Sequence, residues 1–73
     1  MTKIAMYTND KHWLLVIFRT PKGNLVGEVY NGIYKRGKWD MRATFEGSDA
    51  TEYRVKEYFG FATSHHPIWK RWA

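Results

Sequence analysis

The sequence contains no cysteine and only two prolines, and its longest uninterrupted apolar run covers six residues. Without cysteine the chain has neither a disulfide nor a thiolate metal site, which suits a reducing cytoplasm. Such a run is far shorter than the roughly 20 apolar residues that cross a bilayer. The N-terminal residues also lead into no long apolar signal segment. We therefore expect a cytoplasmic protein without a membrane partner.

Aromatic residues are abundant by contrast, with four Trp, five Tyr and four Phe in 73 residues. A domain of this size buries only about 60% of the surface that its unfolded chain exposes, so its stability is marginal. Each large ring can bury on the order of 150–250 Å². We therefore expect residues 1–73 to form one small domain whose core is rich in aromatic side chains.

The apolar run over residues 13–18 is the centre of the predicted fold. A short β-branched and aromatic run, closed by the Pro-Lys-Gly-Asn turn at 21–24, is typical of a strand buried on both faces. A looser strand over 3–8 precedes it, with Ile4 and Met6 expected to face the core. A return strand over 25–30 follows, in which Gly27 predicts a bulge or a ring packed over bare backbone.

Two turn signals follow, Asn31-Gly32 and Arg36-Gly37, and we favour the second. Residues 39–46 then alternate between apolar and polar side chains, as a half-buried antiparallel strand does. Asp49 and Glu52 have the spacing of a capping box at the start of a helix. An apolar stripe formed by Thr51, Val55, Tyr58, Phe59 and Ala62 would face the sheet.

These elements predict an α+β fold. It has a small antiparallel sheet of three or four strands, one C-terminal helix over 49–62 packed on one face, and an aromatic tail. Gly60 lies near the expected helix end, and residues 68–72 are expected to form one last helical turn. Because one helix covers one face, the strand over 13–18 needs a second cover. We expect the tail residues Ile68, Trp69 and Trp72 to supply it, with a homodimer as the alternative.

No pattern in the sequence indicates catalysis. His65 and His66 are adjacent and cannot converge on one ion as an i,i+4 helical pair does. Asp40 and Glu46 lie on one strand but roughly 20 Å apart. We expect a protein that is not an enzyme and that has no catalytic residue, no metal and no cofactor.

The best functional signal is the mixing of basic and aromatic residues in a chain with a net charge of +5. Cations neutralise phosphates and flat rings stack on unpaired bases, so this mixture predicts a module that binds DNA or RNA. The residues expected to bind nucleic acid are Lys22, Tyr34, Lys35, Arg36, Lys38, Arg42, Lys70 and Arg71.

The alternative is a small protein-binding inhibitor or adaptor, whose partner would be a protein complex that handles nucleic acid. It would use exposed aromatic side chains, because such rings dominate protein interfaces. The residues expected to bind that partner are Tyr30, Tyr34, Trp69 and Trp72.

Residues 32–39 and 44–47 combine a glycine–tryptophan turn with a step from strand to helix. In these segments the sequence resembles the plant-type three-stranded DNA-reading domain. The layout of a small sheet and one helix is also similar to the arm-type DNA-binding domains of phage integrases. Both resemblances imply DNA binding. The same layout and size are similar to small phage-encoded anti-CRISPR proteins, which would imply inhibition of a host complex.

Overall fold

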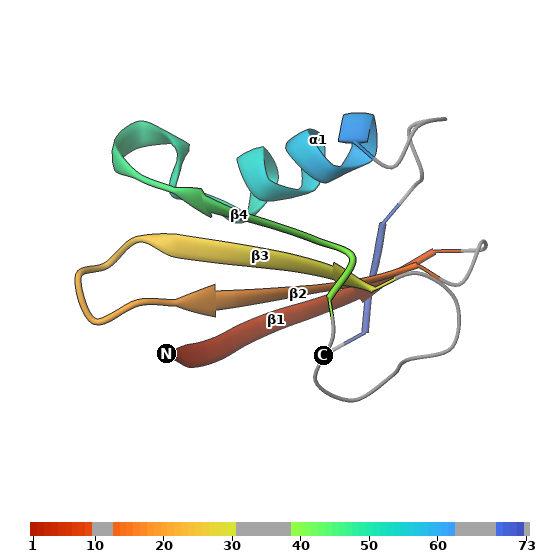
Figure 1. Cartoon of the computed structure of the whole chain (residues 1–73), viewed down its shortest axis with the longest axis horizontal. Coiled ribbons are helices and arrows are strands. Elements are labelled where there is room, and N and C mark those ends of the chain that lie inside the picture. The colour runs from red at the N-terminus through yellow and green to blue at the C-terminus, as the bar shows by residue number, and fades with distance from the viewer. Residues whose placement is uncertain (10–12, 31–38, 63–68, 73) are drawn as a thin grey trace.

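The computed structural model of the chain (Figure 1) describes residues 1–9, 13–30, 39–62 and 69–72. These residues form five antiparallel strands and one α-helix. The sheet has the order β4-β3-β2-β1-β5. The predicted α+β class and its single helix are confirmed, but the sheet has five strands rather than three or four. The elements are β1 (Thr2–Thr8), β2 (Leu14–Arg19), β3 (Leu25–Tyr30), β4 (Met41–Phe45), a 3-10 turn (Gly47–Asp49), α1 (Glu52–Ala62) and β5 (Lys70–Arg71).

The core lies between the sheet and α1, which crosses one face of the sheet (Figure 1). Val55 and Phe59 of the predicted helical stripe are fully buried, and they pack against Leu15, Ile17 and Val29. Each such side chain stabilises the fold by about 1.5–3 kcal/mol on burial. The expected alternation of β4 is also confirmed, because Phe45 is buried while Arg42 and Thr44 are exposed.

Gly27 lets α1 approach the sheet closely. A Cβ atom at this position would lie 2.5 Å from Cε2 of Phe59 and 2.8 Å from Cγ1 of Val55. The pairing of Gly27 with Ile17 and with Ala43 continues without a register shift. Of the two alternatives for this glycine, the ring packed over bare backbone is therefore correct, and the bulge is not.

A bulge lies instead in β1, between Lys3 and Ala5. The extra residue changes which side chains face α1: Ala5 and Tyr7 are buried in the helix-side core, and Ile4 packs against it. Met6 packs on the opposite side of the sheet. The prediction that Ile4 and Met6 share the core face is therefore wrong for Met6, because strict alternation fails at the bulge.

The helix begins later than predicted. Thr51 is its N-cap residue, since its Oγ1 accepts a hydrogen bond of 3.2 Å from the backbone N–H of Arg54. Asp49 belongs to the preceding 3-10 turn, and its carboxylate accepts a hydrogen bond from the Arg54 side chain. Gly60 lies within α1 rather than at its end.

The C-terminal tail forms a strand, not the expected helical turn. In β5, Lys70 pairs with Thr8 and Arg71 with Tyr7. The backbone N–H of Trp72 also donates to the carbonyl of Met6 at 2.7 Å. The unpaired backbone groups along the edge of β1 explain this choice, because an edge strand binds any extended segment that reaches it. Both predicted turns, at 31–32 and 36–37, lie outside the described residues.

Within the described ranges, no helix combines the length and the apolar character that a membrane span requires.

Candidate binding face

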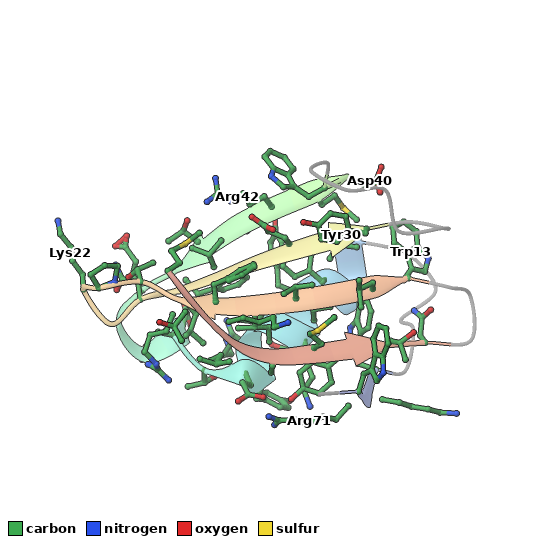
Figure 2. All side chains as sticks on the ribbon, turned by 90° about the horizontal axis from the view of Figure 1, so that it is seen from below. Trp13, Lys22, Tyr30, Asp40, Arg42 and Arg71 are labelled. Carbon is green, nitrogen blue, oxygen red and sulfur yellow. The ribbon has the colours of Figure 1, made fainter. Side chains whose placement is uncertain are left out.

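The face of the sheet turned away from α1, which we name the far face, carries a second apolar cluster. Leu14, Val16 and Tyr30 form its buried part, and Met6 and Phe18 pack against them. Figure 2 looks onto this face. The cluster follows from the unbroken apolar run of β2, whose alternate residues turn to opposite sides of the sheet. The prediction of a strand with both faces screened from water is therefore confirmed for residues 14–17.

A groove with a volume of about 650 Å³ runs over this cluster. Its size falls within the range of about 300–1,000 Å³ that is usual for ligand sites. Buried Leu14 and Val16 form the floor, whereas Met1 and Trp72 stand at the rim with 61% and 64% of their surface exposed. The lining residues are Met1, Lys3, Met6, Leu14, Val16, Phe18, Tyr30 and Trp72.

A buried carboxylate lies beside the groove. Glu28 is 8% exposed, and its Oε1 accepts a 2.9 Å hydrogen bond from the Tyr30 hydroxyl. Its Oε2 lies 3.2 Å from Nε of Arg42, the residue directly opposite on β4. An unpaired buried carboxylate would be strongly destabilising. Since both oxygens have partners, Glu28 fixes the positions of Tyr30 and Arg42.

The groove is electrostatically asymmetric along its length. Lys3 lies on its rim at the end nearest the β2–β3 turn, and Lys3 makes no ion pair within the part of the chain that the structure describes. Tyr30 lies at the other end, whereas Trp72 lies beside Met6 near the middle, since its backbone N–H donates to the Met6 carbonyl. The groove can therefore accept an apolar group along its floor and an anionic group at one end.

Three of the predicted supporting cations lie apart from one another in the structure. Lys22 lies in the β2–β3 turn, Arg42 on β4 and Arg71 on β5, at three different places on the molecule (Figure 2). Arg42 is paired with Glu28 and lies 5.8 Å from the ring centroid of Trp39. Lys70 is on β5 beside Arg71. The predicted residues Tyr34, Lys35, Arg36 and Lys38 lie outside the described residues, as do all three histidines.

Arg71 belongs to a network on the helix side of the β1–β5 edge. Its Nη1 lies 3.4 Å from Oε1 of Glu52, and its guanidinium carbon lies 5.8 Å from the centroid of the Tyr7 ring. Nζ of Lys56 lies 4.7 Å from the same centroid. The Tyr7 hydroxyl donates a hydrogen bond to Glu52. Burial raises the pKa of Tyr7, and the Glu52 carboxylate raises it further.

The two tail tryptophans lie on opposite sides of the sheet. Trp72 lines the groove, whereas Trp69 packs against the helix-side core and donates from its indole N–H to the carbonyl of Lys56 at 3.1 Å. Residues three apart in an extended segment face opposite ways. The prediction that both rings cover the far face is therefore wrong for Trp69. Ile68, the third predicted cover, lies outside the described residues.

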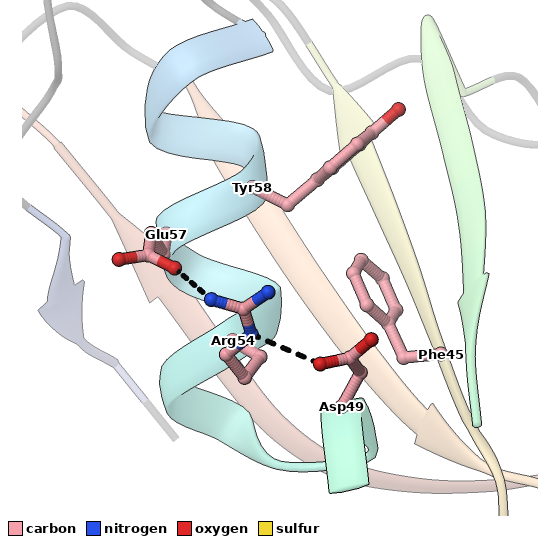
Figure 3. Close-up of a pocket in the computed structure, with 5 residues that line it drawn as sticks. All are labelled: Phe45, Asp49, Arg54, Glu57 and Tyr58. Atoms are coloured by element: carbon pink, nitrogen blue, oxygen red, sulfur yellow. Dashed lines mark hydrogen bonds and ion pairs between the residues drawn. The ribbon is translucent and has the colours of Figure 1, made fainter. Parts of the chain in front are cut away.

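A smaller pocket of about 270 Å³ lies between the start of α1 and β4 (Figure 3). Arg54 spans it, with Nε 3.2 Å from Oδ1 of Asp49 and Nη1 2.5 Å from Oε1 of Glu57. Phe45 and Tyr58 supply its apolar wall. Two carboxylates flank this one guanidinium, so the pocket offers no uncompensated positive charge to an anion.

Sequence reasoning found two of the groove residues, Tyr30 and Trp72, but missed Lys3, Met6 and Phe18. The signal for this face was the lack of polar alternation in 13–18, which indicated a second apolar surface. It did not show which residues of the neighbouring strands lie beside that surface. Their placement depends on the register after the bulge in β1.

Among the described residues, no three His, Cys, Asp or Glu side chains lie close enough to hold a metal ion. No family model, no curated protein and no solved structure matches this chain, so the family resemblances of residues 32–39 and 44–47 stay predictions.

Proposed function

We propose that this chain is a non-enzymatic module that binds a protein partner on its far face. The observation that carries the proposal is the groove itself, in which buried Leu14 and Val16 form an apolar floor below an exposed Trp72. Concave sites lined mostly by apolar side chains and bordered by a few polar groups are typical of binding sites. Tryptophan is also among the residues that contribute most to binding free energy when a partner covers them.

The polar groups of this face support binding rather than proton transfer. Glu28 accepts from the Tyr30 hydroxyl and from Arg42 at ordinary hydrogen-bond distances. A general base needs an oxygen that is open to the substrate proton. The Glu28–Arg42 pair instead gives the apolar groove a rigid polar border.

The test is capture of partners from a cell lysate that has been treated with nuclease, followed by reconstitution with the purified partner. Trp72→Ala should weaken the reconstituted complex by about tenfold or more, because tryptophan is enriched among the interface residues that contribute most to binding. Tyr53→Ala is the matched control, because Tyr53 is similarly exposed at 68% but lies on α1. Equal weakening by both variants, or by neither, would contradict the assignment of this face.

Nucleic-acid binding is the second candidate, and a separate observation favours it. Tyr53, Lys56, Glu57 and Trp69 line a hollow of about 310 Å³, in which the Lys56 cation accompanies the exposed Tyr53 ring. An exposed ring beside cations is the arrangement by which proteins stack an unpaired base and hold its phosphate. Single-stranded DNA at low salt should then bind the chain, and Tyr53→Ala should weaken that binding.

The predicted basic turn provides an independent test of this second candidate. Replacing Lys35, Arg36 and Lys38 together by Ala should weaken binding to every sequence and flatten its salt dependence, because each neutralised phosphate releases counterions. Unchanged affinity for DNA and RNA at low salt, with the fold intact, would exclude the turn as the binding site.

A further inference from the structure

We propose that the partner segment is an amphipathic α-helix with an acidic side chain at one end of its apolar face, and that this acidic end lies at Lys3. The inference rests on the proposed function, since it describes the occupant of the same groove. It follows from three properties of the groove: its length, its apolar floor and the position of its charge.

The length of the groove fits a short helix. Its lining begins at Lys3, which pairs with Phe18, and reaches the level of Leu14, which pairs with Tyr30 and with Thr8. The bulge adds one residue to β1, so the span is counted along β2, where the four residue steps from Phe18 to Leu14 correspond to about 13 Å. A helix of about nine residues, or two and a half turns, spans the same distance.

The floor fits the apolar stripe of such a helix. Across the sheet, the far face presents Met6, Val16 and Leu14 along the middle of the groove, with Phe18 at one end and Tyr30 at the other. No charged side chain lines the groove between its two ends. Large apolar residues at i, i+3 or i+4, and i+7 of a helix would lie along this floor, as in other complexes that seat a helix in a groove.

The charge pattern fixes the place of the acidic end of the helix. Lys3, Phe18, Val26 and Thr44 form one row across the far face, and Lys3 is its one charged member. Arg19 and Lys22 lie at the same end of the sheet, and neither makes an ion pair within the described ranges. The nearest carboxylate on this face, Glu28, is already paired with Arg42. This end of the groove therefore attracts an anionic group.

The test uses synthetic helical peptides that differ at one position. The first carries Leu and Phe along one face and a single Glu at one end of that face; its twins carry Gln or Lys in place of the Glu. Binding to the full chain is measured by fluorescence anisotropy. We expect the Glu peptide to bind about two- to fivefold more tightly than the Gln twin, the usual value of a partly exposed ion pair. The Lys twin should bind more weakly still.

Two variants locate the effect. Lys3→Ala should abolish the preference for Glu over Gln, so that the two peptides bind this variant with equal affinity. Lys22→Ala is the matched control, because Lys22 lies at the same end of the molecule but does not line the groove. It should keep the preference. The difference between the Glu and Gln peptides should also shrink as salt is raised from low concentration to about 1 M, because salt screens exposed charges.

Each alternative outcome has a defined meaning. If all three peptides bind equally and Trp72→Ala weakens them, the proposed function stands and the acidic helix is refuted. If no peptide binds and light scattering shows a dimer that Trp72→Ala dissociates, a second copy occupies the face and both proposals fail. If no peptide binds but vesicles of phosphatidylcholine with oleic acid do, the groove takes lipid and both proposals again fail.

Discussion

Gly27→Ala is the substitution whose effect the structure fixes most closely. The added methyl carbon would lie 2.5 Å from the Phe59 ring and 2.8 Å from Val55, whereas ordinary contact begins at 3.4 Å. Both neighbours are fully buried, so α1 and the sheet must separate locally by close to an ångström. Overpacking of this kind typically costs about 1–3 kcal/mol, with the upper half expected here. Reduced entropy of the unfolded chain offsets about 0.5–1 kcal/mol.

The net loss of about 2 kcal/mol is a large fraction of the 4–11 kcal/mol expected for a domain of this size. It should lower the melting temperature by roughly 8–16 °C. Urea unfolding followed by tryptophan fluorescence measures the change. Gly60→Ala is the control, because a Cβ atom on Gly60 meets nothing within 4 Å, and it should stabilise α1 by up to about 1 kcal/mol.

A double-mutant cycle assigns the loss to its cause. Phe59→Leu shortens the side chain that the new methyl group meets, so it should cost less in the Gly27→Ala background than in the parent. A coupling energy of about 0.5–1 kcal/mol or more is expected for residues in direct contact. A Gly27→Ala protein that unfolds at the parent's urea midpoint would refute the close packing of α1 on β3.

Three further predictions concern the helix cap, pH and the tail. Thr51→Ala should lower the free energy of unfolding by about 1 kcal/mol, because the N-cap hydrogen bond to Arg54 is lost. Asp49→Ala should change it by less than about 0.5 kcal/mol, since its exposed ion pair contributes little. The urea midpoints of the two variants measure the difference. Burial raises the folded-state pKa of Tyr7 above its ordinary 10.0, so its hydroxyl contributes stability below pH 10 that is lost as pH rises through the folded-state pKa. Tyr7→Phe should remove this alkaline step from a series of urea midpoints taken at increasing pH. Trp69→Ala should destabilise the fold by about 2–4 kcal/mol, since its ring packs on the core. Trp72→Ala should leave thermal melting near that of the parent, because Trp72 is exposed; similar melting of both variants would contradict the packing of Trp69 on the core.

The sequence predicted those parts of the fold that depend on residues close together in the chain. The alternation of residues 39–46 indicated a half-buried strand, and Met41, Ala43 and Phe45 do turn toward α1. Val55 and Phe59, four residues apart, are both buried against the sheet as the helical stripe required, whereas Thr51 and Tyr58 of the same predicted stripe are exposed. These features depend on neighbours that are close in sequence, so the sequence alone suffices to find them.

The elements that the sequence did not predict depend on residues that are distant in the chain. A strand as short as β5 has no periodicity of its own, and it exists because β1 offers unpaired backbone groups to Lys70 and Arg71. The bulge between Lys3 and Ala5 leaves no mark in the sequence, yet it decides that Met6 and Lys3 line the groove. The candidate site was therefore only partly predictable, since its composition follows from strand register.

The neighbours Gly27 and Glu28 also bear on how the chain selects its strand pairing. A slip of β3 by one residue against β2 would exchange the faces of the two side chains. The Glu28 carboxylate would then enter the space under Phe59 and Val55 that now has no room even for a methyl carbon, and it would lose Arg42 and Tyr30. Such a misaligned hairpin carries both a steric clash and an unpaired buried charge. Two adjacent residues thus make the misaligned pairing incompatible with the packing of α1, so the helix can pack only on the native register.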